Sequence, residues 1–203
     1  MQKHSYPGKL IVFEGPDGSG HTTQAELLQA NLESRGLEAF LTSEPTRDGS
    51  IAPVLDNVLK KLDILEPFEL QVLFVQDRRE HLGNFIIPAL KERKIVICDR
   101  YILSTLAYGS AETNLEKLIE LNNDFPMPDA TFVLNIRPEL SAERIAERTE
   151  ERYLFESLGG IRRVAEAYKS LATRFPNIYL MDGERPVAEL HREVLGKVKP
   201  LLA

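Results

Sequence analysis

Residues 9–23 read Lys-Leu-Ile-Val-Phe-Glu-Gly-Pro-Asp-Gly-Ser-Gly-His-Thr-Thr, which suggests a strand, a glycine-rich turn and the start of a helix. The apolar run at 10–13 is typical of a parallel strand that is covered on both faces. The glycines in the turn allow positive φ angles and let backbone N–H groups approach a ligand closely. The helix begins near Thr22, and its N-terminus offers free N–H groups and the positive end of its dipole. This arrangement predicts an anion site.

The turn has the spacing of the phosphate-binding loop, Gly15-x4-Gly20-His21-Thr22, except that a histidine replaces the usual lysine. The alternative is a tight strand-to-helix turn that binds nothing. Histidine is shorter than lysine and only partly charged near neutral pH. We therefore expect His21 to be a weaker cation, which a bound triphosphate would protonate. The sequence predicts phosphate binding with reduced catalytic strength.

The composition is that of a globular chain of 203 residues, 28% of them charged and 43% hydrophobic. A net charge of −6 argues against binding of a nucleic-acid polymer. Cys98 is the only cysteine, so no internal disulfide is expected and a reducing cytosol fits. Its place inside an apolar run favours a buried core residue over a nucleophile. No stretch has the length of a signal peptide or membrane span, so we expect a cytoplasmic location and no membrane partner.

Alternating strand-like and helix-like segments indicate the fold class. Further strands are expected at 37–42, 95–98, 130–136 and 178–181. Helices are expected at 51–62, 67–93, 102–108, 114–122, 139–148 and 187–202, with a break near Gly83 or Pro88 left open. This alternation predicts an α/β protein with a doubly wound parallel sheet, in a single domain that spans 1–203.

Two segments are expected at the edge of the sheet where ligands bind. The loop at 43–50 follows the second strand at its carboxyl end. Asp99 ends the strand at 95–98, a usual position for an acid beside a phosphate that carries Mg²⁺. The alternative for Asp99 is the N-cap of the next helix, and one carboxylate could do both.

The segment at 143–156 is rich in charge. Arg144, Arg148 and Arg152 recur every four residues, so a continuous helix would place them on one face. Glu147 and Glu151 are interleaved with them, which favours a solvated, salt-bridged helix face. The alternative is a lid that closes arginines over transferring phosphates.

Four motifs resemble, in order and spacing, those of thymidylate kinases. They are Phe13-Glu14-Gly15-Pro16-Asp17-Gly18-Ser19-Gly20-x-Thr22-Thr23, Glu44-Pro45, Leu73-Phe74-x-x-Asp77-Arg78 and Asp99-Arg100-Tyr101-x-x-Ser104-x-x-Ala107-Tyr108. The resemblance implies a P-loop nucleoside monophosphate kinase fold, with a five-stranded parallel sheet and helices on both faces. It also implies ATP as donor, dTMP as acceptor, Mg²⁺ as metal, a homodimer, and a mobile lid at about 143–156.

The resemblance assigns the donor site to the first motif. The residues that would hold the ATP phosphates are Gly15, Pro16, Asp17, Gly18, Ser19, Gly20, His21, Thr22 and Thr23. The Thr22 hydroxyl and the Asp99 carboxylate would bind Mg²⁺. Arg100 would grip the acceptor phosphate, and the alternative for this arginine is a surface ion pair.

The acceptor site follows from the other motifs. By the resemblance, Asp17 would lie near the sugar 3′-OH and the acceptor phosphate, with Glu44 in the same substrate site. Phe74 would stack on thymine, and Arg78, one turn further on, would donate to the base carbonyl. The alternative for Phe74 is ordinary helix core, because it shares a face with Leu70.

Side chains after Asp99 complete the implied acceptor site. Ser104 and Thr105 would face the pyrimidine edge. Tyr108 would crowd the 2′ position of the sugar and so select deoxyribose.

This sequence departs from the family pattern at three places. His21 stands for the lysine, and residues 46–48 are Thr-Arg-Asp where many members have glycines. Leu154 stands where many members have a second acid. Because Gly18 is not an arginine, the family's logic requires an arginine from the lid, with Arg148 and Arg152 as candidates.

The leading hypothesis is in-line transfer of the ATP γ-phosphoryl group to dTMP, driven by positioning and charge neutralisation. Asp99, Arg100, His21 and a lid arginine would carry the catalysis. Replacing His21 by lysine is then expected to raise kcat, unless the site is built around histidine. The alternatives are a nucleotide-binding protein with weak or lost transfer activity, and a kinase for another nucleoside monophosphate.

Overall fold

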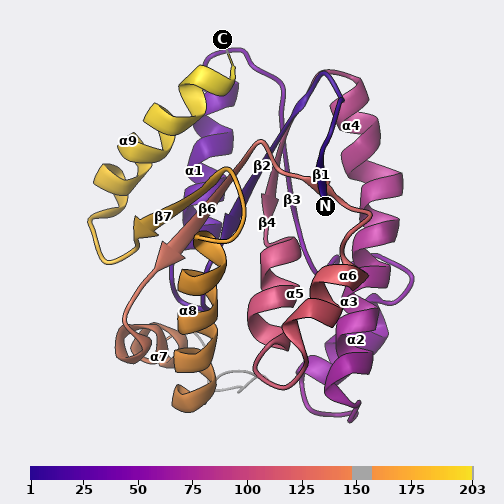
Figure 1. Ribbon diagram of the computed structural model, residues 1–203. Helices are drawn as coiled ribbons and strands as arrows, with labels where there is room; N and C mark the ends of the chain where they lie inside the picture. Colours follow the sequence, from indigo (N-terminus) through magenta and orange to yellow (C-terminus); the bar gives the residue numbers. More distant parts are fainter. Residues whose placement is uncertain (148–156, 203) are drawn as a thin grey trace.

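The computed structural model describes residues 1–147 and 157–202. Its centre is a five-stranded parallel sheet with the strand order β3-β4-β2-β6-β7 (Figure 1). The strands are β2 (Lys9–Glu14), β3 (Ala39–Ser43), β4 (Ile95–Asp99), β6 (Ala130–Asn135) and β7 (Ile178–Asp182). The predicted α/β class and parallel sheet are confirmed.

Helices cover both faces of this sheet (Figure 1). They are α1 (His21–Ser34), α2 (Ala52–Leu59), α3 (Pro67–His81), α4 (Ile87–Lys91), α5 (Ile102–Gly109), α6 (Leu115–Leu121), α7 (Pro138–Ala146), α8 (Leu158–Ala172) and α9 (Val187–Val198), followed by a 3₁₀ turn over Lys199–Leu201.

An apolar core lies on each face of the sheet. Both faces have one because successive strand residues point to opposite faces. Ile11 and Phe13 of β2 pack on one face, in a cluster that includes Leu28 of α1 and Val194 of α9. Leu10 and Val12 belong to the other cluster, which also contains residues of α3, α4, α5, α6, α8 and the π turn. All four of these strand residues are at most 1% exposed.

The register of the sheet aligns the carboxyl ends of three strands. Phe13 of β2 and Ser43 of β3 both lie opposite Asp99 of β4. The loops that follow these strands therefore meet at one edge, above which ligands bind in open parallel sheets.

The helical region at 67–93 does not break at Gly83 or Pro88. A π-helical turn at Leu82–Ile86 joins α3 directly to α4. Pro88 lacks an N–H and its ring crowds the preceding turn, and a widened turn before it relieves both constraints.

Helix α8 and a small second sheet are absent from the sequence predictions. In α8 the buried residues Ile161, Val164, Ala165, Tyr168 and Leu171 follow helical spacing, a pattern that the sequence does contain. The second sheet pairs β1 (Gln2–Lys3) with β5 (Pro126–Met127), and these strands are too short to show a period. In the described part of the chain, the helices lack the combined length and apolar character that a membrane crossing needs.

Candidate active site

The glycine-rich turn has the geometry of an anion cradle. Gly15, Gly18 and Gly20 have φ angles of 150°, 77° and 91°, which side-chain-bearing residues rarely adopt. Gly20 caps α1 without a side-chain hydrogen bond, so the first N–H groups of the helix remain available to a ligand. The Ser19 hydroxyl is buried and has no protein partner among the described residues. These features fit the phosphates of a nucleotide.

Thr22 and Asp99 meet as the sequence predicts. The Thr22 hydroxyl donates to Asp99 Oδ2 at 2.7 Å. A hydroxyl and a carboxylate are hard oxygen ligands of the kind that Mg²⁺ prefers beside phosphates, so the pair fits that metal. The N-cap alternative for Asp99 is wrong, because α5 starts at Ile102 with Tyr101 as its cap.

The pKa of Asp99 lies below its usual value. Burial acts to raise the pKa, but the hydrogen bonds from His21 and Thr22 and the charge of Arg100 outweigh it. Asp99 is therefore held as an ionised carboxylate at the edge of the sheet.

His21 bridges Asp99 and Arg100. Its Nδ1 lies 2.5 Å from Asp99 Oδ1, and its Nε2 lies 2.9 Å from Arg100 Nη2. An arginine can only donate, so Nε2 must accept and the imidazole proton lies on Nδ1. In this arrangement His21 is a neutral link between two charged groups. It does not present the cation expected from the sequence.

Arg100 is enclosed by protein acceptors. Its Nη2 also donates to Asp17 Oδ1 at 2.6 Å, and its Nη1 donates to the Gly15 carbonyl at 2.9 Å. The ion pair with Asp17 exists, but the Arg100 side chain is only 15% exposed, so the surface-pair alternative does not describe it. Its backbone adopts a left-handed φ angle of 70°.

Tyr108 lies beside this pair. The guanidinium carbon of Arg100 is 5.2 Å from the centre of the Tyr108 ring. The Tyr108 hydroxyl donates to Asp17 Oδ2 at 3.1 Å, and burial is the main cause that raises its pKa. The ring therefore stacks against Arg100, and its hydroxyl is hydrogen-bonded to Asp17.

A buried carboxylate that the sequence analysis did not single out as a site residue supports the same region. Glu14 is fully buried and accepts from the Ser104 hydroxyl at 2.6 Å and from the Tyr168 hydroxyl at 2.8 Å. Burial raises the pKa of Glu14, although these hydrogen bonds and Arg100 oppose the shift. The Ser104 hydroxyl also accepts from Arg100 at 3.2 Å. Ser104 thus holds Glu14 and Arg100 together, where the resemblance implied a contact with the pyrimidine.

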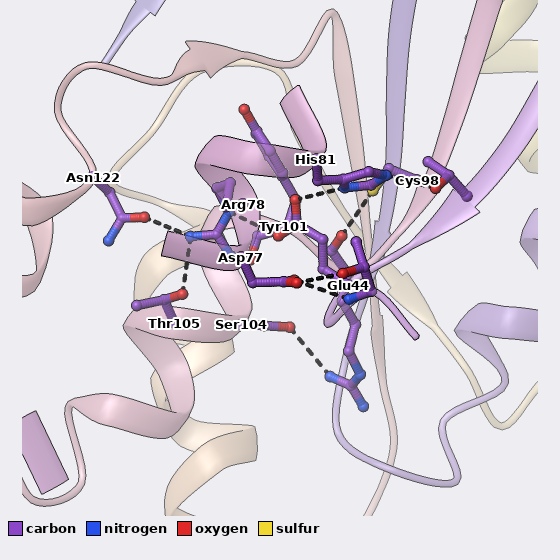
Figure 2. A network of polar contacts seen from close by, with 12 residues as sticks. Glu44, Asp77, Arg78, His81, Cys98, Tyr101, Ser104, Thr105 and Asn122 are labelled. Carbon is purple, nitrogen blue, oxygen red and sulfur yellow. Dashed lines mark hydrogen bonds and ion pairs between the residues drawn. The ribbon is translucent and has the colours of Figure 1, made fainter. Parts of the chain in front are cut away.

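Arg78 forms the centre of a second polar network (Figure 2). The side chain is 2% exposed, and Nε donates to Glu44 Oε2 at 2.8 Å. Its other bonds go to the Thr105 hydroxyl at 3.0 Å, Asn122 Oδ1 at 2.6 Å and the Tyr101 carbonyl at 2.8 Å. Among the described residues, these bonds account for four of the five N–H groups of the guanidinium.

Further contacts fix Glu44 and the loop after β3. His81 lies 3.1 Å from Glu44 Oε1 through Nδ1 and 2.6 Å from the Thr42 hydroxyl through Nε2. The Thr46 backbone N–H donates to Asp77 Oδ2 at 2.9 Å. Asn122 and His81 were missed because their partners lie 44 and 37 residues away in the sequence.

Cys98 is a structural residue. It is fully buried, and its thiol donates to the Arg100 carbonyl at 3.0 Å. Burial, with the charge of Glu44 and Asp99, raises its pKa well above the usual value. The Cys98 thiol lies close to Glu44 and His81, the other members of a possible metal-binding group. However, Glu44 is already bonded to Arg78, and His81 is already bonded to Thr42.

Phe74 is half-buried. It packs against the small cluster of Leu55, Val58 and Leu70 between α2 and α3. This position fits a residue of the helix core, and it also fits a ring with one part left exposed for stacking on a base.

Of the charged segment at 143–156, the structure describes the residues up to Glu147. Arg144, on α7, donates from Nη1 to the Gly18 carbonyl at 3.0 Å. Arg148 and Arg152, the predicted lid arginines, lie outside the described residues, as do Glu151 and Leu154. The lid remains a prediction.

The five-stranded parallel sheet, the phosphate-binding loop and the acid at the end of β4 define a P-loop kinase of the nucleoside monophosphate class. The family model described as thymidylate kinase matches residues 13–194. A thymidylate kinase from Desulfotalea psychrophila is 36% identical over 198 residues, which cover 97% of this chain and 96% of that protein. One from Pelotomaculum thermopropionicum is 38% identical over 206 residues, which cover 96% and 94%. The chain belongs to the thymidylate kinase family.

Proposed function

We propose that this chain transfers the γ-phosphoryl group of ATP to dTMP, giving ADP and dTDP. The observation that carries the proposal is the junction of two sites through His21. In this proposal Asp99 and Thr22 would serve the donor, and Arg100, Asp17 and Tyr108, which are linked to them by hydrogen bonds, would serve the acceptor. Two anionic substrates that bind on either side of this junction would have their phosphates adjacent.

The acceptor is already an anion, so the chain needs to position it and neutralise charge. The loop at 15–23 would hold the donor phosphates through backbone N–H groups. Thr22 and Asp99 would hold Mg²⁺, which supplies charge neutralisation when it is bound. Arg100 would orient the acceptor phosphate by exchanging one of its present acceptors for a phosphate oxygen.

The base and sugar of the acceptor would contact the network around Arg78. Its one remaining N–H would donate to a carbonyl of thymine while Glu44 and Asn122 hold the guanidinium still. The exposed part of the Phe74 ring would stack on the base. Tyr108, fixed beside Arg100, would exclude a 2′-hydroxyl.

The test is ADP release with a panel of acceptors: dTMP, dUMP, dCMP, dAMP, dGMP and UMP. We expect dTMP to give the highest kcat/KM. A clear preference for another acceptor would replace dTMP in the proposal.

A binding protein without transfer activity is the second candidate, because His21 is engaged by Asp99 and Arg100. Running the assay from acid to neutral pH separates the two. Nucleotide binding with no dTMP-dependent ADP release at any pH would favour the inactive protein.

We also propose a homodimer that acts in the cytoplasm. The support for the dimer is an apolar face on α3, where Phe68 and Val72 are 41% and 38% exposed one helical turn apart. Val54 on the adjacent helix α2 is 46% exposed. Sedimentation at micromolar concentration should give the mass of two chains, and Val72→Lys should shift it toward one.

A further inference from the structure

We propose that Tyr168 of α8 is a positioning residue for Arg100, because its hydroxyl keeps the Arg100 guanidinium apart from the buried carboxylate of Glu14. The inference rests on the proposed function in one respect, namely that Arg100 binds the phosphate of dTMP. Tyr168 lies 68 residues from Arg100 in the sequence, and none of the four motifs that carry the resemblance includes it.

Tyr168 reaches this region from the interior of the protein. Its side chain is 1% exposed and lies on the buried face of α8. The hydroxyl lies 2.8 Å from Glu14 Oε2, 2.9 Å from Ser104 Oγ and 3.4 Å from Arg100 Nη1. A buried tyrosine usually finds a partner for its hydroxyl, and here all three partners belong to the surroundings of Arg100.

The Tyr168 hydroxyl donates to Glu14 and accepts from Arg100. Burial and the charge of Glu14 raise the pKa of Tyr168 well above its usual value, so the hydroxyl keeps its proton. An arginine can only donate, so the proton of Tyr168 goes to Glu14. Ser104 makes the same two contacts, because its hydroxyl donates to Glu14 Oε2 at 2.6 Å and accepts from Arg100 Nη1 at 3.2 Å. Two hydroxyls therefore lie between one carboxylate oxygen and one guanidinium nitrogen.

Glu14 is bound in the manner of an ionised carboxylate. Besides the two hydroxyls, it accepts through Oε1 from the backbone N–H groups of Tyr101 at 2.8 Å and Ser104 at 3.2 Å. A carboxyl group that accepts from four donors has no use for a proton of its own. The two N–H groups lie at the start of α5, so Glu14 also holds the helix that follows Arg100.

A direct ion pair with Glu14 would draw Arg100 away from the acceptor. In the described part of the chain, Arg100 forms its ion pair with Asp17 and none with Glu14. The Asp17 side chain is 40% exposed, so a ligand can compete for that pair, whereas Glu14 is fully buried. Because opposite charges attract more strongly in the interior than near solvent, contact with Glu14 would compete with a phosphate. The hydroxyls of Tyr168 and Ser104 separate the two charges.

The Tyr168 ring makes a second contact that can be tested apart from the hydroxyl. It meets the Tyr108 ring edge to face, with the ring centres 6.3 Å apart and the planes at 87°. Tyr108 in turn stacks on the guanidinium of Arg100. Phenylalanine at 168 would keep this ring contact and remove the hydroxyl.

The experiment is equilibrium binding by calorimetry with dTMP and with thymidine, which lacks the phosphate. The ratio of the two affinities measures how strongly the chain holds the phosphate. The variants are Tyr168→Phe and the double variant Glu14→Gln/Tyr168→Phe. The matched control is Tyr179→Phe, because Tyr179 also packs its ring against an aromatic neighbour, Phe132 at 5.4 Å, but lies on the edge strand β7. Thermal unfolding of each variant checks that it is folded.

We expect Tyr168→Phe to weaken dTMP binding about 10-fold, on the scale of one hydrogen bond to a charged group, with thymidine affinity unchanged. Glutamine at position 14 can still accept from the N–H groups at the start of α5 but cannot form an ion pair with Arg100. The double variant should therefore regain most of the dTMP affinity. Tyr179→Phe should match the wild type with both probes.

Equal dTMP affinity in wild type and Tyr168→Phe would overturn the inference. So would equal losses for dTMP and thymidine, since Tyr168 would then support only the packing of the site. A double variant that binds dTMP no better than Tyr168→Phe would also overturn it, as would a wild type that does not prefer dTMP to thymidine. The proposed function fails by a different result, binding of dTMP without transfer from ATP.

Discussion

Arg100 donates from Nη2 to Nε2 of His21 across 2.9 Å, so the residue that replaces the loop lysine is an acceptor for the neighbouring arginine. The same imidazole lies 2.5 Å from Asp99 on its other side. Asp99, proposed for the donor site, and Arg100, proposed for the acceptor site, are therefore held in one chain of hydrogen bonds. A lysine at this position could reach Asp99 but would place a second positive charge beside Arg100.

The first prediction concerns substitutions at His21. The sequence favours a gain in kcat from His21→Lys, and the contact with Arg100 reverses this expectation. His21→Asn can still donate to Asp99, whereas His21→Lys repels Arg100. We expect kcat with dTMP to fall in the order wild type, Asn, Lys, with the lysine variant about 10²-fold lower, on the scale of losing one preorganised hydrogen-bond donor. Steady-state kinetics measure it, and the order Lys, wild type, Asn would show that charge at 21 is what matters.

The second prediction concerns Arg78. Arg78→Lys keeps the charge but cannot donate to Glu44, Thr105 and Asn122 together. We expect the free energy of unfolding to fall by about 3 kcal/mol, as when a buried pair is broken, and KM for dTMP to rise. Arg79→Lys is the control, because Arg79 is the exposed neighbour on the same helix. Urea unfolding of both variants measures it, and equal stabilities would mean that the network around Arg78 contributes little.

The third prediction concerns the sugar. Tyr108→Phe keeps the ring beside Arg100 and removes the hydroxyl that donates to Asp17, whereas Tyr108→Ala removes the ring. We expect the phenylalanine variant to keep its preference for dUMP over UMP and the alanine variant to lose most of it. Competition between dUMP and UMP as acceptors measures the ratio of their kcat/KM values. If the alanine variant still rejects UMP, another group excludes the 2′-hydroxyl.

The fourth prediction is a pH dependence of stability from Asp129. Burial acts to raise the pKa of Asp129, but hydrogen bonds from His4 and from the Leu10 backbone, with the charges of His4 and Lys9, lower it below the usual 3.8. A carboxyl group with a lowered pKa in the folded state stabilises the protein above its unfolded pKa, and this contribution is lost as the pH falls through the folded pKa. We expect Asp129→Asn to lose about 1 kcal/mol at pH 7 and to show a smaller difference near pH 3.

Melting temperatures between pH 3 and 7 measure this effect. Asp124→Asn is the control, an exposed carboxylate in the same connection between α6 and β6. A constant difference between wild type and Asp129→Asn across that range would contradict the assignment.

The sequence predicts well what local chemistry determines. The strand, the glycine turn and α1 follow one another without interruption, so period and glycine spacing identify them. Thr22 and Asp99 meet because parallel strands end at one edge, a rule that holds whatever the intervening residues are. The sequence also contains the apolar spacing of α8, although the predictions do not include this helix.

The sequence does not reveal the partners of these residues, because they come from distant segments. Glu14 is joined to Tyr168 across 154 residues, and His21 to Arg100 across 79. Which nitrogen of His21 carries the proton depends on Arg100, and the loop motif by itself predicts only a substitute for lysine. In the structure His21 joins Asp99 to Arg100 and does not act as the expected cation.

The decisive measurement is transfer of label from [γ-³²P]ATP to dTMP by the purified wild-type chain, with products separated and counted. We expect labelled dTDP to form in step with ADP, and no transfer when dTMP is left out. Tight binding of both nucleotides with no labelled dTDP at any pH would contradict the view that the junction at His21 brings two phosphates together for reaction.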